Sequence, residues 1–198
     1  MSSRKQIYEI MYKRATDESQ LEWHREEIPM FVGKAVAQVV RRGKALDLGC
    51  GTGVHSLYLA QQGFRVTAID FVSSALDFAR KRANEAGVEI QFVHADILEW
   101  ETPDHFDLII DSGCLHSMRG DSRKRYKVQL LKWLDPSSLY GLLHFAKRHF
   151  FDFGLVGPQR KTREDIERFF APELRLTEFY AETGKKPLNQ YLFLAKDQ

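Results

Sequence analysis

The chain has 198 residues, of which 43% are hydrophobic and 28% are charged, and its formal net charge is +2. This length fits one domain with a full core, taken here as residues 1–198. No apolar stretch approaches the roughly 20 residues of a membrane-spanning helix, and so small a charge gives no reason to expect a nucleic-acid partner.

Two cysteines, Cys50 and Cys114, lie far apart and lack the spacing of metal ligands. They predict free thiols, no metal site and a reducing, cytoplasmic setting. The first 20 residues carry charges throughout and have no apolar centre, so we do not expect them to be a signal peptide. Composition leaves a monomer and a homodimer equally open.

Residues 1–40 are predicted to form helices packed ahead of a sheet. The segment "IPMFVGKAVAQVV", residues 28–40, has apolar residues at helical spacing and is interpreted as core packing. "LEWHREEIP" precedes it and contains Trp23, either a lid or stacking residue or simple core filling.

After Gly43, short apolar runs typical of strands alternate with helical patterns, which predicts a doubly wound α/β sheet with helices on both faces. The predicted helices are residues 54–62, 73–86, 123–134 and 163–170, with Ser73 as an N-cap and Gly87 ending its helix. The predicted strands are residues 44–49, 64–70, 89–96, 106–113, 139–146, 176–182 and 190–196.

The last two predicted strands are joined only by "TGKKPL", residues 183–188. A parallel crossover needs a dozen or more residues, so this pair is predicted to be an antiparallel hairpin. The sheet is therefore expected to be seven-stranded and mostly parallel.

Three glycines, Gly49, Gly51 and Gly53, follow the first predicted strand in "ALDLGCGTG". A loop at the carboxyl end of that strand, opening a helix, is where such sheets bind nucleotide-like ligands. A tight turn without a ligand is the alternative. Cys50 within the loop is interpreted as a small space-filler rather than a nucleophile.

A dinucleotide and S-adenosylmethionine are the two candidate ligands of this loop. The dinucleotide pattern G-x-G-x-x-G requires glycine at position 54, where the chain has Val54. Asp70, about 20 residues after the loop begins, suits ribose hydroxyls, which both ligands contain. Asp96, with Ile97 beside it, ends the third strand where an adenine amino group is expected, and this favours an adenosine clamp.

The segments "LDLGCGTG", "AIDFVSSALDFAR" and "HADIL" resemble the first three motifs of class I S-adenosylmethionine-dependent methyltransferases. The resemblance covers nearly the whole chain from Ala45 onward. It implies the strand order 3-2-1-4-5-7-6 with the seventh strand antiparallel, and S-adenosylmethionine as cofactor.

A narrower resemblance begins at "FDLIIDSGCLHSMRGDSRKRYKVQLLKWLDP". This segment is similar to the thiopurine methyltransferase and tellurite-resistance methyltransferase group, through Asp111, Gly113, Leu115, Arg123 and Tyr126. In that group a tryptophan near the N-terminus and a lid helix close over the ligands, which assigns a lid to residues 1–40 and places Trp23 in it. Ser112 departs from the group's arginine and removes a cation that meets an anionic substrate; His116 follows it.

These patterns assign the glycines to the methionine portion, Asp70 to ribose, Asp96 and Ile97 to adenine, and Asp111 and Ser112 to the methionine amino group and methyl. His116 is the candidate for acceptor contact or general base, with loop orientation as the alternative, because histidines titrate near neutral pH. Aromatic residues 150–153 either line an apolar pocket or pack. The predicted cofactor-binding residues are Trp23, Gly49, Cys50, Gly51, Gly53, Asp70, Phe71, Asp96, Ile97, Asp111 and Ser112.

The sequence predicts methyl transfer to a small molecule, by in-line displacement onto a thiol, oxyanion, phenol or amine. Near-neutral charge disfavours a nucleic-acid or protein acceptor, and we expect no membrane partner. A cofactor-binding protein without transfer activity stays open, and a nicotinamide-dependent oxidoreductase is disfavoured by Val54 and Asp96.

Overall fold

The computed structural model describes residues 3–39, 42–149, 151–152, 157–184 and 186–196. Its seven strands form one sheet in the order β3-β2-β1-β4-β5-β7-β6. The strands are β1 (Lys44–Leu48), β2 (Arg65–Asp70), β3 (Gln91–His94), β4 (Phe106–Asp111), β5 (Leu134–Phe145), β6 (Leu174–Glu182) and β7 (Leu188–Ala195). The helices are α1 (Ser3–Arg14), α2 (Met30–Gln38), α3 (Val54–Gln61), α4 (Ser73–Ala86), α5 (Asp121–Lys132) and α6 (Arg163–Phe170), with short 3-10 helices η1 (Glu18–Gln20) and η2 (Leu115–Ser117).

The predicted topology is confirmed. Strands β1 to β5 pair in parallel, and β7 runs antiparallel to both β5 and β6. The short connection after β6 therefore makes the expected hairpin, because five residues allow the chain to reverse but not to cross the sheet.

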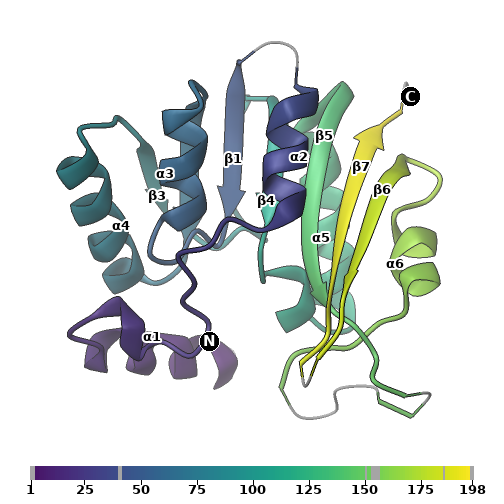
Figure 1. The fold of residues 1–198 in the computed structure, drawn as a ribbon, viewed down its shortest axis with the longest axis horizontal. Helices are drawn as coiled ribbons and strands as arrows, with labels where there is room; N and C mark the ends of the chain where they lie inside the picture. Colours follow the sequence, from purple (N-terminus) through teal and green to yellow (C-terminus); the bar gives the residue numbers. More distant parts are fainter. Residues whose placement is uncertain (1–2, 40–41, 150, 153–156, 185, 197–198) are drawn as a thin grey trace.

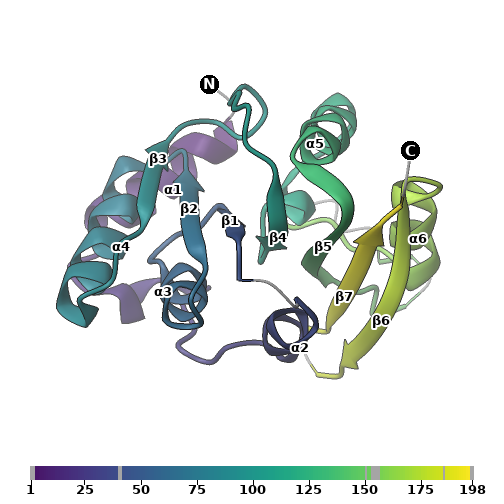
Figure 2. The same ribbon diagram turned by 90° about the horizontal axis from the view of Figure 1, so that it is seen from above.

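Alternate residues of the central strands point into two separate cores, as the period of two in a strand requires. Leu46 of β1 lies in the core under α5 and α6, whereas Ala45 lies in the core under α2 and α3. Figure 2 shows α2 and α3 on one face of the sheet and α5 and α6 on the other. The predicted packing role of residues 28–40 is confirmed by the burial of four α2 side chains: Phe31, Val32, Ala35 and Val36.

Several boundaries differ from the sequence predictions. Val72, not Ser73, is the N-cap of α4, and no side chain caps that helix. Helix α5 begins at Asp121, after Gly120, where an acidic residue in the first turn suits the helix dipole. Strand β5 begins at Leu134, five residues before the predicted start, because Leu134 already pairs with Phe106. Gly87 ends α4 in the left-handed conformation, as predicted.

The carboxyl ends of β1 to β5 lie on one edge of the sheet, and Figure 1 shows α1 at this end of the molecule, below α4 and α3. The predicted site residues come from the loops at this edge and from the N-terminal segment. No helix in the described part of the chain is long and apolar enough to cross a membrane.

Candidate active site

The glycine loop between β1 and α3 has a left-handed backbone at all three glycines, with φ of 65° at Gly49, 54° at Gly51 and 80° at Gly53. Space is restricted as well. A Cβ at Gly53 would lie 2.8 Å from the Cβ of Ala79 on α4, and one at Gly51 would lie 2.8 Å from the hydroxyl of Tyr12. Glycine is therefore required for backbone conformation and for close packing.

Asp70 ends β2 directly beside this loop and is 6% exposed. Its carboxylate accepts hydrogen bonds from the backbone N–H of Gly51 (3.0 Å) and of Val72 (2.9 Å). Burial raises the pKa of Asp70 to about 6, against the opposing effect of these hydrogen bonds. A carboxylate has about four acceptor positions, so two are left for a ligand's hydroxyl groups.

A second buried carboxylate, Asp47 of β1, accepts a 2.5 Å hydrogen bond from the Ser56 hydroxyl on α3. Burial raises the pKa of Asp47 to about 6. This contact joins the strand before the glycine loop to the helix after it, and so holds the loop at both ends.

Asp96, Ile97 and Phe71 lie at the ends of β3 and β2. One Asp96 oxygen accepts from the backbone N–H of Leu98 at 3.0 Å, and the other forms an ion pair with Lys5 of α1. The Lys5 ammonium also lies 5.5 Å from the centroid of the Phe71 ring. Ile97 is buried in the core under α5. The sequence prediction placed an adenine amino group on Asp96, and here a lysine ammonium occupies that carboxylate.

Helix α1 covers the glycine loop through aromatic side chains. Trp23 is 38% exposed and donates its indole N–H to the Tyr12 hydroxyl at 3.0 Å. The Trp23 ring also packs edge-on against Tyr8, with centroids 5.2 Å apart. Burial, and next the charge of Asp70, raise the pKa of Tyr12. Trp23 therefore belongs to a partly exposed aromatic cover and not to either core.

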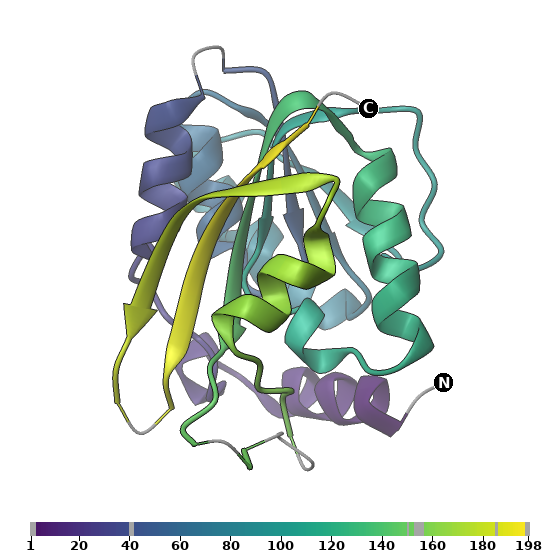
Figure 3. The same cartoon turned by 90° about the vertical axis from the view of Figure 1, so that its right-hand side faces the viewer.

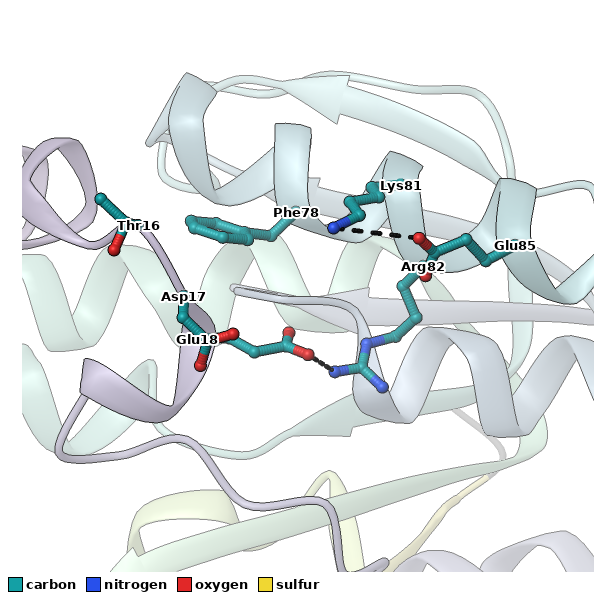
Figure 4. A pocket seen from close by; sticks show the side chains of 7 residues that line it. All are labelled: Thr16, Asp17, Glu18, Phe78, Lys81, Arg82 and Glu85. Carbon is teal, nitrogen blue, oxygen red and sulfur yellow. Dashed lines mark hydrogen bonds and ion pairs between the residues drawn. The ribbon is translucent and has the colours of Figure 1, made fainter.

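An ion-pair network holds η1 and the following segment against α4. Arg82 of α4 pairs with Glu18 and Glu26 and donates to the Thr52 carbonyl in the glycine loop at 3.1 Å. His24 joins the network through Glu26 and lies 3.1 Å from the Thr52 hydroxyl. Figure 4 shows Glu18 pointing toward the Arg82 guanidinium across a hollow of about 110 Å³. That volume is below the ~300 Å³ of ordinary ligand pockets, so we assign no ligand to the hollow and treat it as part of this ion-pair network.

Asp111, which the sequence predicts beside the methionine amino group, is hydrogen-bonded within the protein. Its side chain is fully buried, and it accepts hydrogen bonds from the backbone N–H groups of Gly113, Cys114 and Leu115 at 2.7–3.0 Å. The Tyr126 hydroxyl donates a fourth bond at 2.5 Å. These four donors use the acceptor capacity of a carboxylate. Asp111 therefore holds the loop after β4, and its predicted contact with the cofactor, like that of half-buried Ser112, stays a prediction.

His116, on η2, lies where β4 and β5 end. Its ring packs against Phe145 and His144 of β5, with centroid distances of 4.9 and 5.9 Å. His144 is completely buried, and its Nδ1 donates to the Phe145 carbonyl at 3.0 Å. Its Nε2 therefore faces the Arg123 guanidinium, 3.5 Å away, as an acceptor. Burial lowers the pKa of His144, so it is neutral at pH 7.

The predicted aromatic run falls partly outside the described residues, because Phe150 and Phe153 are not among them. Phe151 is 76% exposed and does not pack in the core. The residues that the sequence prediction missed are Lys5, Tyr8 and Tyr12 on α1 and Arg160 and Lys161 after β5. Their positions along the chain do not show that they meet, and only the folded chain brings them to the edge of the sheet.

Residues 45–137 match a protein family described as a methyltransferase domain. Over 119 residues the chain is 34% identical to 2-heptyl-1-hydroxyquinolin-4(1H)-one methyltransferase of Mycobacteroides abscessus, an alignment covering 59% of this chain and 52% of that protein. The chain spans about half or less of the length of the curated relatives it matches.

Two solved structures resemble this chain in fold. The 1,6-didemethyltoxoflavin-N1-methyltransferase of Burkholderia thailandensis superposes with a TM-score of 0.77 at 18% identity, covering 100% of this chain and 92% of that one. TehB of Haemophilus influenzae gives a TM-score of 0.73 at 17% identity, covering 85% of this chain and 63% of that one. At these identities the likeness shows the fold, and the narrower resemblance to the tellurite-resistance group stays a prediction.

Proposed function

We propose that this chain, whose residues 45–137 match a methyltransferase domain, uses S-adenosylmethionine to methylate a small-molecule acceptor by in-line displacement. The observation that supports this most directly is the meeting of the glycine loop, Asp70 and Asp96 at the carboxyl edge of the sheet. The Mycobacteroides relative, whose name gives a small heterocyclic acceptor, supports the acceptor class.

The side chains at this edge suit S-adenosylmethionine. Asp70 has two acceptor positions left for ribose hydroxyls, and the glycine loop lets the backbone approach the methionine portion. Phe71 and Ile97 flank the place we assign to adenine. When bound, the cofactor supplies an activated methyl group on a sulfonium. The protein's own tasks are to orient that methyl, to exclude water and to position the acceptor.

We assign α1 and Trp23 to a lid over the cofactor. The pairing of Lys5 with Asp96 requires α1 to shift before an adenine amino group donates to that carboxylate. The network of Arg82, Glu18 and Glu26 gives α1 a hinge point at η1, because it ties the chain just after α1 to α4.

We assign His116 to the acceptor side. It is half-buried beside Phe145, next to Ser112 and Gly113, at the end of the strand where the methyl is expected. A neutral imidazole there accepts a proton from a phenol or an amine, whereas a thiol ionised near pH 7 needs no base.

Two other functions make different predictions. A binding protein without transfer activity takes up S-adenosylmethionine but releases no S-adenosylhomocysteine with any acceptor. A nicotinamide-dependent oxidoreductase binds NADH, which Val54 in place of the third glycine of the dinucleotide pattern disfavours.

Calorimetric titration with S-adenosylmethionine and, separately, NADH tests the proposal. We expect micromolar binding of S-adenosylmethionine only, weakened about 100-fold in Asp70→Ala, since two hydrogen bonds to a charged group are lost. Asp77→Asn, an exposed carboxylate on α4, is the matched control and leaves binding unchanged. Equal binding by Asp70→Ala and wild type would show that the site is misassigned.

A further inference from the structure

A cationic cluster lies beside His116, on the side of the edge away from the glycine loop. We define it as Arg123 of α5 together with Arg160 and Lys161 of the segment before α6. Backbone hydrogen bonds bring that segment here: the Lys161 N–H donates to the Phe145 carbonyl at 3.1 Å, and the Gln159 N–H donates to the His116 carbonyl at 2.7 Å. Figure 3 shows α5 and α6 on this face, with the chain leaving β5 below them.

Arg123 is 9% exposed, yet it forms no ion pair within the part of the chain that the structure describes. Its guanidinium carbon lies 4.4 Å from the centroid of the Phe169 ring, and among the described residues its hydrogen-bond partner is the neutral His144. The nearby carboxylate of Asp111 already accepts four hydrogen bonds. A buried cation without an anion is costly, because desolvation is not offset by a partner charge.

Lys161 adds a second cation. Its pKa is lowered, first by burial and then by the charge of Arg123, so the two like charges act on each other. Asp152 pairs with Arg148 and Arg160. The Asp165 charge acts on Lys161 and on Arg123, but Asp165 is shared with Lys147 and also accepts from the Thr162 N–H. One shared carboxylate leaves the cluster with an excess of positive charge, which a bound anion would stabilise.

Arg160 supplies a donor without an acceptor. Its guanidinium carbon lies 5.3 Å from the centroid of the Phe145 ring, and one terminal nitrogen, Nη1, is buried without a hydrogen-bond partner in the part of the chain that the structure describes. The cluster thus combines unused cationic donors with the aromatic rings of His116 and Phe145. Carboxylates are the groups that guanidinium donors hold best, and aromatic rings favour a flat ligand body.

We propose that Arg123 and Lys161 hold the carboxylate of an aromatic acid, so that the methyl acceptor carries a negative charge. Identifying this acid as the methyl acceptor rests on the proposed function, but the existence of an anion-binding site does not.

Benzoate and benzamide, which differ in charge but not in shape, test the site in NMR titrations with and without S-adenosylhomocysteine. We expect benzoate to bind at least about tenfold more tightly than benzamide, since a hydrogen bond to a charged group is worth that much. Lys161→Gln is expected to weaken benzoate binding about tenfold, whereas Lys124→Gln, an exposed lysine on α5, leaves it within about twofold.

Equal binding of benzoate and benzamide, or equal losses in Lys161→Gln and Lys124→Gln, would overturn the proposal. If sulfate competes for the site as well as benzoate does, the part of the proposal that requires an aromatic ligand is overturned. Benzoate binding by Arg123→Gln is interpreted only if the melting temperature of this variant stays near that of wild type. Binding of S-adenosylhomocysteine, measured on the same samples, separates the two inferences: its absence from wild type contradicts the proposed function and leaves the anion test readable.

Discussion

The two halves of the carboxyl edge differ in the charged groups that lack a charged partner from a neighbouring strand end. At the ends of β1 and β2 these are the carboxylates Asp47 and Asp70, whereas beside β4 and β5 they are the cations Arg123 and Lys161, because the Asp111 carboxylate already accepts four hydrogen bonds. Carboxylates suit the hydroxyl and amino donors and the positive sulfonium of the proposed cofactor. Cations suit an electron-rich acceptor. If both proposals hold, the electrostatics of adjacent strand ends keep the methyl donor and its acceptor apart.

Gly53→Ala gives the largest expected effect and tests whether the cofactor half depends on backbone geometry. A Cβ at φ 80° is strained, and it meets the Cβ of Ala79 at 2.8 Å. We expect the free energy of unfolding to fall by about 2–4 kcal/mol. Gly87→Ala is the control, since Gly87 has a similar φ of 65° but open space, and about 1 kcal/mol is expected there. Equal losses measured by urea denaturation would mean that packing against α4 adds nothing.

Tyr126→Phe tests the brace of the acceptor half. It removes the hydroxyl that donates to buried Asp111 at 2.5 Å, and we expect a loss of about 1–3 kcal/mol in unfolding free energy. Tyr140→Phe removes a hydroxyl whose partner is the Tyr126 hydroxyl at 2.9 Å, so about 1 kcal/mol is expected. If the two variants lose equal stability, the Asp111 contact is not the stronger one.

The cofactor half could be predicted from the sequence better than the acceptor half. The cofactor half is local: Gly49, Gly51 and Gly53 need special backbone angles, and Asp70 sits at a fixed distance from them along the chain. The strand order came from the family resemblance, and the hairpin from the short link after β6. The acceptor half is formed by α5, β5 and the segment before α6. Because Arg123 and His144 lie on different elements, no short sequence pattern predicts their contact.

Local sequence patterns also do not show the tertiary contacts that determine the surroundings of a residue. Asp111 follows a strand just as Asp70 does, but three backbone N–H groups and Tyr126 enclose it. Ser73 has a good capping side chain, yet the helix begins on it and not after it. Tyr12 lies 39 residues from Gly51 along the chain and still determines how much room that glycine has.

Asp47→Asn tests, through the pH dependence of the unfolding free energy, whether a buried carboxylate of the cofactor half titrates at a raised pKa. Burial raises the pKa of Asp47 from 3.8 to about 6, so the native state binds more protons than the unfolded chain between these values. Stability from this group is therefore present at low pH and lost as pH rises from about 4 to 6.

The Asp47→Asn variant should lose that dependence. We expect its unfolding free energy relative to wild type to rise by about 1–2 kcal/mol between pH 4 and pH 7, measured by denaturant unfolding. Taking the change with pH cancels the constant cost of the buried amide. Asp77→Asn, an exposed carboxylate on α4, should run parallel to wild type. A parallel curve for Asp47→Asn would mean that Asp47 titrates no differently in the folded chain.

Lys5→Ala has the smallest expected effect and tests whether α1 blocks the cofactor half. Lys5 pairs with Asp96 and lies over Phe71, the two groups we assign to adenine. An ion pair that is partly exposed contributes about 0–1 kcal/mol, so its loss should tighten S-adenosylmethionine binding by at most about fivefold in calorimetry. Lys13→Ala, an exposed lysine on the same helix, should not change the affinity. Weaker binding by Lys5→Ala would instead make Lys5 a ligand contact, with α1 a cover that closes on the cofactor and not a competitor for its site.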